Sequence, residues 1–299
     1  MQDGETMSDH CCSPRRDDGG QACRPPAPGN FAARGDVRDF IDVAGGSFLM
    51  GSEDPLAYPE DGEGPVREVE VAAYSIAATT VTNEQFARFV EATDHVTDAE
   101  RYGDSLVFVG LLRPDAPPTR AVAAAPWWRQ VPGASWRAPE GPGSTVDGRE
   151  DHPVVHVSHR DAAACAAWLG GRLPTEPEWE LAARGGLVQQ PYPWGAEREP
   201  GGIARMKTFA GTFPHRPSEP VGTVPVDAFE PNGLGLRNTT GNVWEWTSGR
   251  FAAGDPRLVL RGGSYLCHDS YCRRYRVSAR TGNTPDTSLG HTGFRVARD

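Results

Sequence analysis

Short apolar runs separated by glycine- and proline-rich turns make up most of the chain beyond about residue 37. Residues 40–51 predict a strand, a turn at Gly45-Gly46 and a second short strand, while residues 67–71 alternate like a half-buried strand. A closing strand is expected over residues 292–297. The pattern therefore favours short strands joined by irregular segments.

Helices are indicated by capping residues rather than by long apolar stripes. Capping boxes begin at Thr82 and Thr175, and Ser158 caps a third helix. The two later helices are expected over residues 161–169 and 178–184, because a pair of glycines follows each of them.

Composition supports one folded domain that is unusually rich in turns. The 299 residues include 35 Gly and 27 Pro, a share above the usual ~12% but below that of low-complexity chains. Residues 1–34 are polar with almost no apolar periodicity, which predicts a disordered leader. We expect a single irregular, loop-rich α+β domain of low secondary-structure content over residues 35–299.

Charge and the absence of apolar segments narrow the class of protein. The formal net charge of -10 argues against nucleic acid or an anionic membrane as the main partner, and an arginine-bearing substrate is easier to accommodate. No apolar run approaches the ~18 residues of a membrane helix, and the N-terminus has no hydrophobic signal core. These features predict a cytoplasmic protein, and we also expect it to be a monomer.

Cysteine usage does not resemble a secreted disulfide framework. Cys11, Cys12 and Cys23 lie in the leader, and Cys165 lies in an alanine-rich helix, where it is expected to be a small buried thiol. The leader cysteines have no role that the sequence reveals.

The main concentration of chemistry is the stretch from Arg261 to Arg276. Cys267 and Cys272 are five residues apart, so their sulfurs converge only if the intervening residues bend, which Asp269 favours. Such a pair is open to three interpretations: a disulfide, half of a zinc site, or a two-thiolate site for a soft ion such as Cu(I). A second pair at zinc-finger spacing is missing, and four arginines in this stretch favour the thiolate form.

Several motifs together resemble the sulfatase-modifying-factor superfamily, whose fold is related to C-type lectin modules. They cover about residues 37–298. The motifs are Gly45-Gly-Ser-Phe-Leu-Met-Gly-Ser52, Arg172-Leu-Pro-Thr-Glu-Pro-Glu-Trp179, Gly241-Asn-Val-Trp-Glu-Trp246, Arg261-Gly-Gly-Ser264 and Gly293-Phe-Arg295.

Within that superfamily, Cys267-His-Asp-Ser-Tyr-Cys272 followed by Arg274-Tyr-Arg276, with Asn283-Thr-Pro-Asp286 downstream, is similar to the formylglycine-generating enzymes. The resemblance implies a copper-dependent oxidoreductase. Such an enzyme uses O2 to convert the cysteine of a Cys-x-Pro-x-Arg motif in an unfolded sulfatase to Cα-formylglycine. The client sulfatase is not implied.

The same resemblance implies roles for individual residues. Cys267 and Cys272 would hold Cu(I), which suits two thiolates because it is soft and tolerates low coordination. Ser264 would lie beside an oxygen pocket walled by Tyr271 and Trp244. His268 is expected either to tune the thiols or to be a solvated turn residue, and both interpretations stay open.

A calcium site is also implied by the resemblance. Asn238 and Glu245 would supply side-chain oxygens, and Gly241 and Val243 backbone oxygens, which suit a hard ion. The alternative is that Asn238 and Glu245 only cap turns. A second calcium site of the family is expected to be lost or remodelled, because Lys207 stands there and an ammonium group cannot ligate calcium.

Two other classes of function compete with this interpretation. One is another enzyme on the same fold with a different thiol substrate, or an iron-dependent enzyme; for the latter, His152 and His156 lack an acidic third member. The other is a non-catalytic lectin-like binding module, which would have no need of paired thiols.

Overall fold

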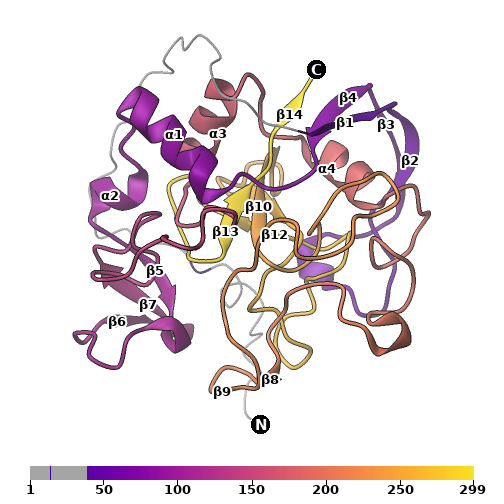
Figure 1. Ribbon diagram of the computed structural model, residues 1–299. Coiled ribbons are helices and arrows are strands. Elements are labelled where there is room, and N and C mark those ends of the chain that lie inside the picture. The colour runs from indigo at the N-terminus through magenta and orange to yellow at the C-terminus, as the bar shows by residue number, and fades with distance from the viewer. Residues whose placement is uncertain (1–13, 15–38) are drawn as a thin grey trace.

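A computed structural model describes Pro14 and residues 39–299 of the chain (Figure 1). The leader expected over residues 1–34 lies outside the described residues except for Pro14. The fold is the expected mixture of short helices, short strands and long irregular segments. The α-helices are α1 (Asn83–Thr93), α2 (Asp98–Tyr102), α3 (His159–Trp168) and α4 (Glu176–Ala183), and the single 3-10 turns are Pro59–Asp61, Val109–Leu111 and Pro200–Gly202.

Each of the three predicted helices directly follows the capping residue that the sequence indicated. Thr82, Ser158 and Thr175 precede α1, α3 and α4, and both reciprocal hydrogen bonds of the capping box are formed in each case. The α3 and α4 helices begin two residues earlier than predicted. Helix α2 was not predicted, because its five residues are too few to show an apolar period.

The strands form several small sheets rather than one large one. The central sheet has the order β12-β11-β10-β13, and its β10 and β13 run parallel. The others have the orders β1-β4-β14, β5-β7-β6, β2-β3 and β8-β9. The strands are β1 (Phe40–Val43), β2 (Gly46–Met50), β3 (Arg67–Val71), β4 (Tyr74–Ala77), β5 (Asp104–Phe108), β6 (Arg120–Val122), β7 (Ala125–Pro132), β8 (Gly211–Thr212), β9 (Arg216–Pro217), β10 (Trp244–Arg250), β11 (Leu258–Arg261), β12 (Arg280–Asn283), β13 (Thr292–Phe294) and β14 (Ala297–Arg298).

Two predicted strand segments are divided between sheets. Strands β1 and β2, on either side of Gly45-Gly46, do not pair with each other, since β1 pairs with β4 and β2 with β3. The closing strand over residues 292–297 is interrupted at the buried Arg295, whose guanidinium donates to the carbonyls of Ala77 and Ala78, both at 3.1 Å. The chain thus passes from the central sheet to the β1-β4-β14 sheet.

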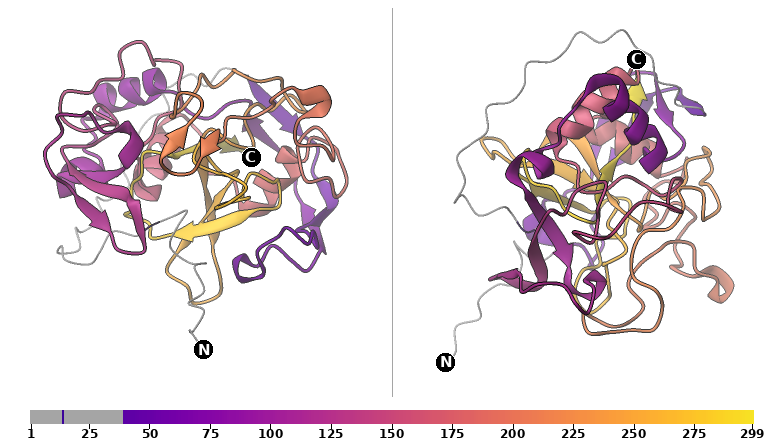
Figure 2. Two further views of the ribbon diagram at one scale, coloured as in Figure 1. Left: turned by 90° about the horizontal axis from the view of Figure 1, so that it is seen from below. Right: turned by 60° about the vertical axis from the view of Figure 1, so that its left-hand side comes forward.

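The central sheet lies in the middle of the molecule (Figure 1). In both Figure 1 and the left view of Figure 2, the β5-β7-β6 sheet lies on one side of it and the β2-β3 sheet on the other. The largest core cluster joins Phe86 and Phe89 of α1 to Trp244 and Trp246 of β10. Cys267 and Cys272 belong to this cluster, so the paired thiols are part of the apolar core. No helix in the described part of the chain is long and apolar enough to span a bilayer.

One residue of the N-terminal segment is placed against the domain. Pro14 is buried, and its carbonyl accepts a hydrogen bond of 3.1 Å from Nδ2 of Asn283, the last residue of β12. Asn283 is itself fully buried.

Candidate functional site

The two cysteines are brought together by the bend that the sequence predicted. The amide of Cys272 donates to the carbonyl of His268 at 2.7 Å, and the amide of His268 donates to the carbonyl of Cys272 at 3.1 Å. The two Sγ atoms lie 3.3 Å apart and are buried. This distance exceeds the ~2.05 Å of a disulfide bond, so the pair is a dithiol rather than a staple.

A glycine pair positions the backbone beneath these thiols. Gly263 has φ +74°, and a Cβ at this position would lie 2.5 Å from the carbonyl oxygen of Arg274. Only glycine allows this backbone conformation and this close approach. In the following residue, Ser264, the backbone amide donates a hydrogen bond to the Cys267 Sγ at 3.3 Å. The Ser264 carbonyl oxygen accepts one from the Cys267 amide at 3.0 Å.

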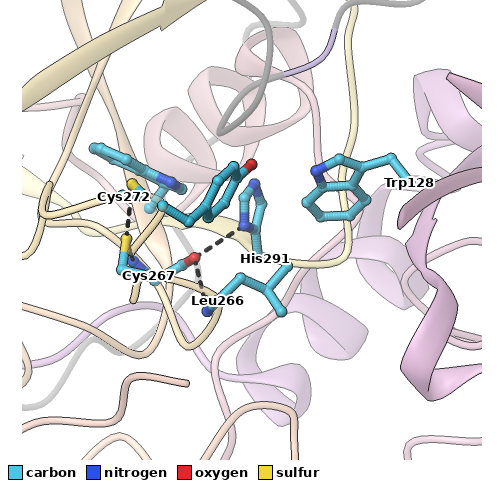
Figure 3. A pocket seen from close by; sticks show the side chains of 8 residues that line it. Trp128, Leu266, Cys267, Cys272 and His291 are labelled. Atoms are coloured by element: carbon cyan, nitrogen blue, oxygen red, sulfur yellow. Dashed lines mark hydrogen bonds between the residues drawn. The ribbon is translucent and has the colours of Figure 1, made fainter. Parts of the chain in front are cut away.

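A small pocket with an almost entirely apolar lining adjoins the dithiol. Figure 3 shows the two sulfurs side by side at one side of it, with Trp128 on the opposite side. The pocket has room for about one water-sized molecule. It is lined by Trp128, Trp244, Ser264, Leu266, Cys267, Tyr271, Cys272 and His291.

Ser264 and His291 are the polar pair of this pocket. The Ser264 Oγ lies 2.9 Å from His291 Nδ1 and accepts from the Leu266 amide at 3.2 Å. Burial lowers the pKa of His291 to about 3, so the imidazole is neutral at physiological pH. When His291 carries its proton on Nδ1, it donates to Ser264, and the Ser264 hydroxyl proton is left to point into the pocket.

Aromatic rings continue the pocket wall outward from Tyr271. The ring of Phe213 stacks on Tyr271 with centroids 4.2 Å apart and planes 8° apart, and the partly exposed Trp127 meets Tyr271 edge-on at 5.0 Å. Such rings offer a rigid apolar surface to an incoming chain.

Three of the four arginines of this stretch form buried ion pairs with carboxylates. Burial raises the pKa of the Cys267 thiol well above its usual range, and the positive charge of Arg274 lowers it by less. The predicted direction of the arginine effect is therefore confirmed for Arg274, but burial outweighs it. The pairs join Arg274 to Asp61, Arg276 to Glu63, and Arg261 to both Glu176 and Glu180.

The structure separates the predicted site residues into two groups. Ser264, Tyr271 and Trp244 line the pocket beside the thiols, as expected. His268 does not line it: its Nδ1 lies 2.8 Å from the Ser270 Oγ and accepts from the Ser270 amide at 3.2 Å, an arrangement typical of a turn residue.

Three lining residues were not among the predicted site residues. Trp128 is one of several tryptophans in a proline-containing stretch, and a large aromatic residue in irregular sequence is more typical of a core than of a site. Leu266 and His291 had no sequence feature that distinguishes them from core residues. Only the folded arrangement brings them to the thiols.

The residues of the predicted calcium site offer mixed support for an ion. The Oδ1 of Asn238 is buried with no partner in the described part of the chain, as expected for an atom that faces a cation. Glu245, in contrast, accepts from Arg295 at 2.6 Å and 2.7 Å and from the Trp179 indole at 2.7 Å. The site therefore fits calcium through Asn238 but not through Glu245, whose charge is already compensated.

Lys207 lies beside the same loop. Its carbonyl accepts from the Asn242 amide at 2.8 Å, and its Nζ lies 3.5 Å from a carboxylate oxygen of Glu219. The ammonium group places positive charge beside this loop, and the loss or remodelling of the second calcium site stays a prediction.

The histidines considered for an iron site form hydrogen bonds within the domain. His156 Nδ1 lies 2.8 Å from the Ser105 Oγ and its Nε2 lies 2.8 Å from the Pro139 carbonyl oxygen. His152 Nδ1 lies 2.8 Å from the Thr223 Oγ1. Because both ring nitrogens of His156 are engaged, this histidine has no lone pair left for a metal.

Comparisons with known proteins agree with this arrangement. The model of the sulfatase-modifying factor enzyme 1-like domain matches residues 27–299. The formylglycine-generating enzyme of Thermomonospora curvata is 54% identical over 88% of this chain and 94% of its own length. A protein of Mus musculus named inactive C-alpha-formylglycine-generating enzyme 2 is 44% identical over 86% of this chain and 85% of its own.

A solved structure shares the fold at lower sequence identity. PvdO from Pseudomonas aeruginosa superposes with a TM-score of 0.58 and 24% identity, covering 87% of this chain and 94% of that one. This likeness shows the shared fold alone.

Proposed function

The chain belongs to the family of sulfatase-modifying factor enzymes, and from this premise we propose that it is an oxidase that converts a peptidyl cysteine of sulfatases to Cα-formylglycine. The substrate would be an unfolded sulfatase, or a peptide with a Cys-x-Pro-x-Arg sequence, and the oxidant would be O2.

One observation carries this proposal beyond family membership. Because a relative named inactive is 44% identical to the chain, overall similarity does not decide whether a member is active. Cys267 and Cys272, with sulfurs 3.3 Å apart beside a pocket of one-molecule size, supply the local chemistry that an oxidase of thiols needs.

The dithiol also fits the proposed copper ion. Two sulfur donors face each other inside an apolar core, and soft sulfur ligands select Cu(I) over hard cations. Bound there, Cu(I) would supply the activation of O2 that amino-acid side chains do not provide.

The surrounding residues have roles that follow from their positions. The apolar lining excludes water from the reacting groups, which protects a reactive species from hydrolysis. Ser264 is held by Leu266 and His291 with a hydroxyl that can donate to a small molecule in the pocket. The stacked Tyr271 and Phe213 would guide the substrate backbone and place its cysteine over the dithiol.

The test is conversion of a defined peptide. Purified protein reconstituted with Cu(I) is given a Cys-x-Pro-x-Arg peptide in aerobic buffer, and the aldehyde is followed by mass spectrometry. We expect an aldehyde at the cysteine of this peptide and none in a matched peptide that carries serine there. A folded, copper-loaded sample that yields no aldehyde would contradict the proposed function.

A further inference from the structure

The exposed apolar side chains of the domain gather at one groove, away from the dithiol pocket. Six large apolar side chains are exposed among residues 39–299, and three of them, Leu49, Leu187 and Val188, rim this groove. Leu49 is 42% exposed and Val188 is 69% exposed. Single exposed apolar residues are ordinary on a protein surface, but a cluster beside a groove is typical of an interaction site.

This groove, the β2 groove, lies between strand β2 and the C-terminal end of helix α4 with the turn that follows it. Its volume is about 400 Å³, and Figure 1 shows α4 beside the β2-β3 sheet. Phe48 of β2 and Leu181 of α4 line the groove and also pack against a buried core cluster. The apolar wall of the groove is therefore held in place by the core.

The free edge of β2 is only partly covered by side chains. Strand β3 pairs with one edge of β2, and no strand of the described chain pairs with the other. On that other edge the Gly51 carbonyl accepts from Arg184 at 2.8 Å, and the Leu49 carbonyl accepts from the Gln189 amide at 2.8 Å. Backbone groups alternate in direction along a strand, so those of Ser47 point to the same edge. Within residues 39–299 no side chain pairs with them.

The charge of the β2 groove is negative. Glu68 lines it with an exposed side chain, which accepts from the Ser47 hydroxyl at 2.7 Å. Arg184 lines it too, but its guanidinium is buried and lies 2.6 Å from a carboxylate oxygen of Glu180. Two copies paired through this edge would bring two acidic grooves together, and each chain has a formal charge of -10. A basic partner is therefore favoured over a second copy.

We propose that the β2 groove is a second docking site for the unfolded sulfatase chain, which binds there through an extended segment outside the Cys-x-Pro-x-Arg motif. The segment would pair with the β2 edge at Ser47, insert an apolar side chain between the rim residues and place a lysine or arginine beside Glu68. This inference rests on the proposed function, because an unfolded substrate offers such extended segments. Two contacts on one chain bind more tightly than either contact alone.

A peptide array tests the proposal without any turnover. Overlapping peptides that tile a sulfatase sequence, with serine in place of the motif cysteine, are immobilised and probed with fluorescently labelled, copper-free, full-length protein. The wild type should bind the motif peptide and also peptides elsewhere that combine apolar and basic residues. The Leu49→Asp, Val188→Asp double variant should lose about ten-fold or more of the signal on the latter, because a carboxylate in an apolar contact is left without a partner. Its signal on the motif peptide should not change.

Two exposed apolar residues elsewhere supply a matched control. Leu56 and Ile203 are 47% and 63% exposed and lie outside the β2 groove, so the Leu56→Asp, Ile203→Asp double variant should bind every peptide as the wild type does. Glu68→Lys alone should weaken the basic peptides, and this exposed substitution keeps the test valid if the first double variant fails to fold. Equal signals from the two double variants would overturn the inference. So would a sedimentation coefficient that falls in the first double variant while its peptide signals persist, since the occupant would then be a second copy.

The two proposals fail in different ways. If the cysteine form of the motif peptide is converted to the aldehyde but no other peptide binds through the β2 groove, the function stands and the docking site does not. If such peptides bind through the groove while copper-loaded protein forms no aldehyde, the groove recognises sulfatase segments and the proposed chemistry is wrong.

Discussion

The reactivity of Cys267 and Cys272 is set by burial in an apolar core. Burial raises the pKa of the Cys267 thiol, so the thiolate forms only when a cation compensates its charge. A bound metal ion provides that compensation because it displaces the proton.

Replacement of either cysteine by serine should abolish tight Cu(I) binding together with peptide conversion. A hydroxyl is a hard donor that does not replace a thiolate. Binding is measured by competition with a Cu(I) chelator and conversion by mass spectrometry. Cys165→Ala is the control, since Cys165 is a buried thiol outside the pocket lining. Tight binding that persists in both Cys267→Ser and Cys272→Ser would rule out a two-thiolate site.

His156 should make the protein sensitive to acid. Burial lowers the pKa of His156 from 6.5 to about 4. Between these two pH values the unfolded state binds a proton at this residue and the folded state does not. The His156 contribution to stability is therefore complete above pH 6.5 and falls by about 1.4 kcal/mol per pH unit down to about pH 4.

The comparison variant is His156→Asn, because the left-handed backbone at this position (φ 59°) suits asparagine. Urea unfolding at several pH values should show the stability difference between wild type and variant narrowing toward pH 4. A constant difference across this range would exclude the assigned role of His156.

Individual residues differ in how far the sequence reveals them. The thiol pair was predictable because its spacing forces a bend and its chemistry is unusual. His291 was not, since a lone histidine in a glycine-rich segment gives no indication of which cavity it will line. The raised pKa of Cys267 was not predictable, because the sequence near Arg274 does not show how deeply the folded chain buries the thiol.

At the scale of secondary structure, a buried ion pair links strand β10 to the end of β13. Glu245 on β10 and Arg295 just after β13 are both fully buried and joined by two hydrogen bonds. Removing one partner of such a pair leaves the other charge uncompensated in the core, at a cost of about 3–5 kcal/mol.

Glu245→Gln should therefore lower the free energy of unfolding by roughly that amount, about 3–5 kcal/mol, measured by urea denaturation. The control is Glu84→Gln, which breaks the exposed pair between Glu84 and Arg88 and should cost about 0.5 kcal/mol or less. Equal effects of the two variants would show that the pair on β10 has no special role.

The loop that leads into β10 is the place to look for calcium. The family resemblance predicts one ion per chain, and the buried, unpartnered Oδ1 of Asn238 is the donor that supports it. Metal analysis of purified protein should find one calcium, lost in Asn238→Ala. If wild-type protein contains none, Glu245 has only its ion-pair role and the Asn238 side chain only caps its turn.

The first residues of the helices could be predicted from the sequence, but the pairing of the strands could not. Capping boxes are local, so four residues suffice to predict where α1 or α4 begins. Strand β4 pairs with β1 and with β14 at the far end of the chain, and no local pattern specifies which short strand takes which partner.

Over the whole molecule, the chain is held together by contacts between distant segments. The β1-β4-β14 sheet combines residues 40–43 and 74–77 with residues 297–298. The core cluster joins α1 and α3 to the central sheet. Neither half of the chain can therefore keep its core without the other.

Unfolding of the domain should consequently be a single cooperative transition. Tryptophan fluorescence reports on the core through Trp244 and Trp246, and far-UV circular dichroism reports on the whole backbone. The two urea transitions should have the same midpoint, and separate midpoints would reveal independent subdomains. Since motifs in both halves carry the family resemblance, the overall fold could be predicted from sequence even though its small sheets could not.

The backbone at Gly263 has a consequence for how this chain can vary. Any L-residue there would place its Cβ 2.5 Å from the Arg274 carbonyl while holding a strained φ of +74°. In a saturation library selected for activity, glycine should be the residue recovered at position 263. All other residues should be lost, even alanine. Gly254, which has a similar φ of 79° but nothing within 4 Å, should admit asparagine, so such a library would separate conformational strain from steric exclusion.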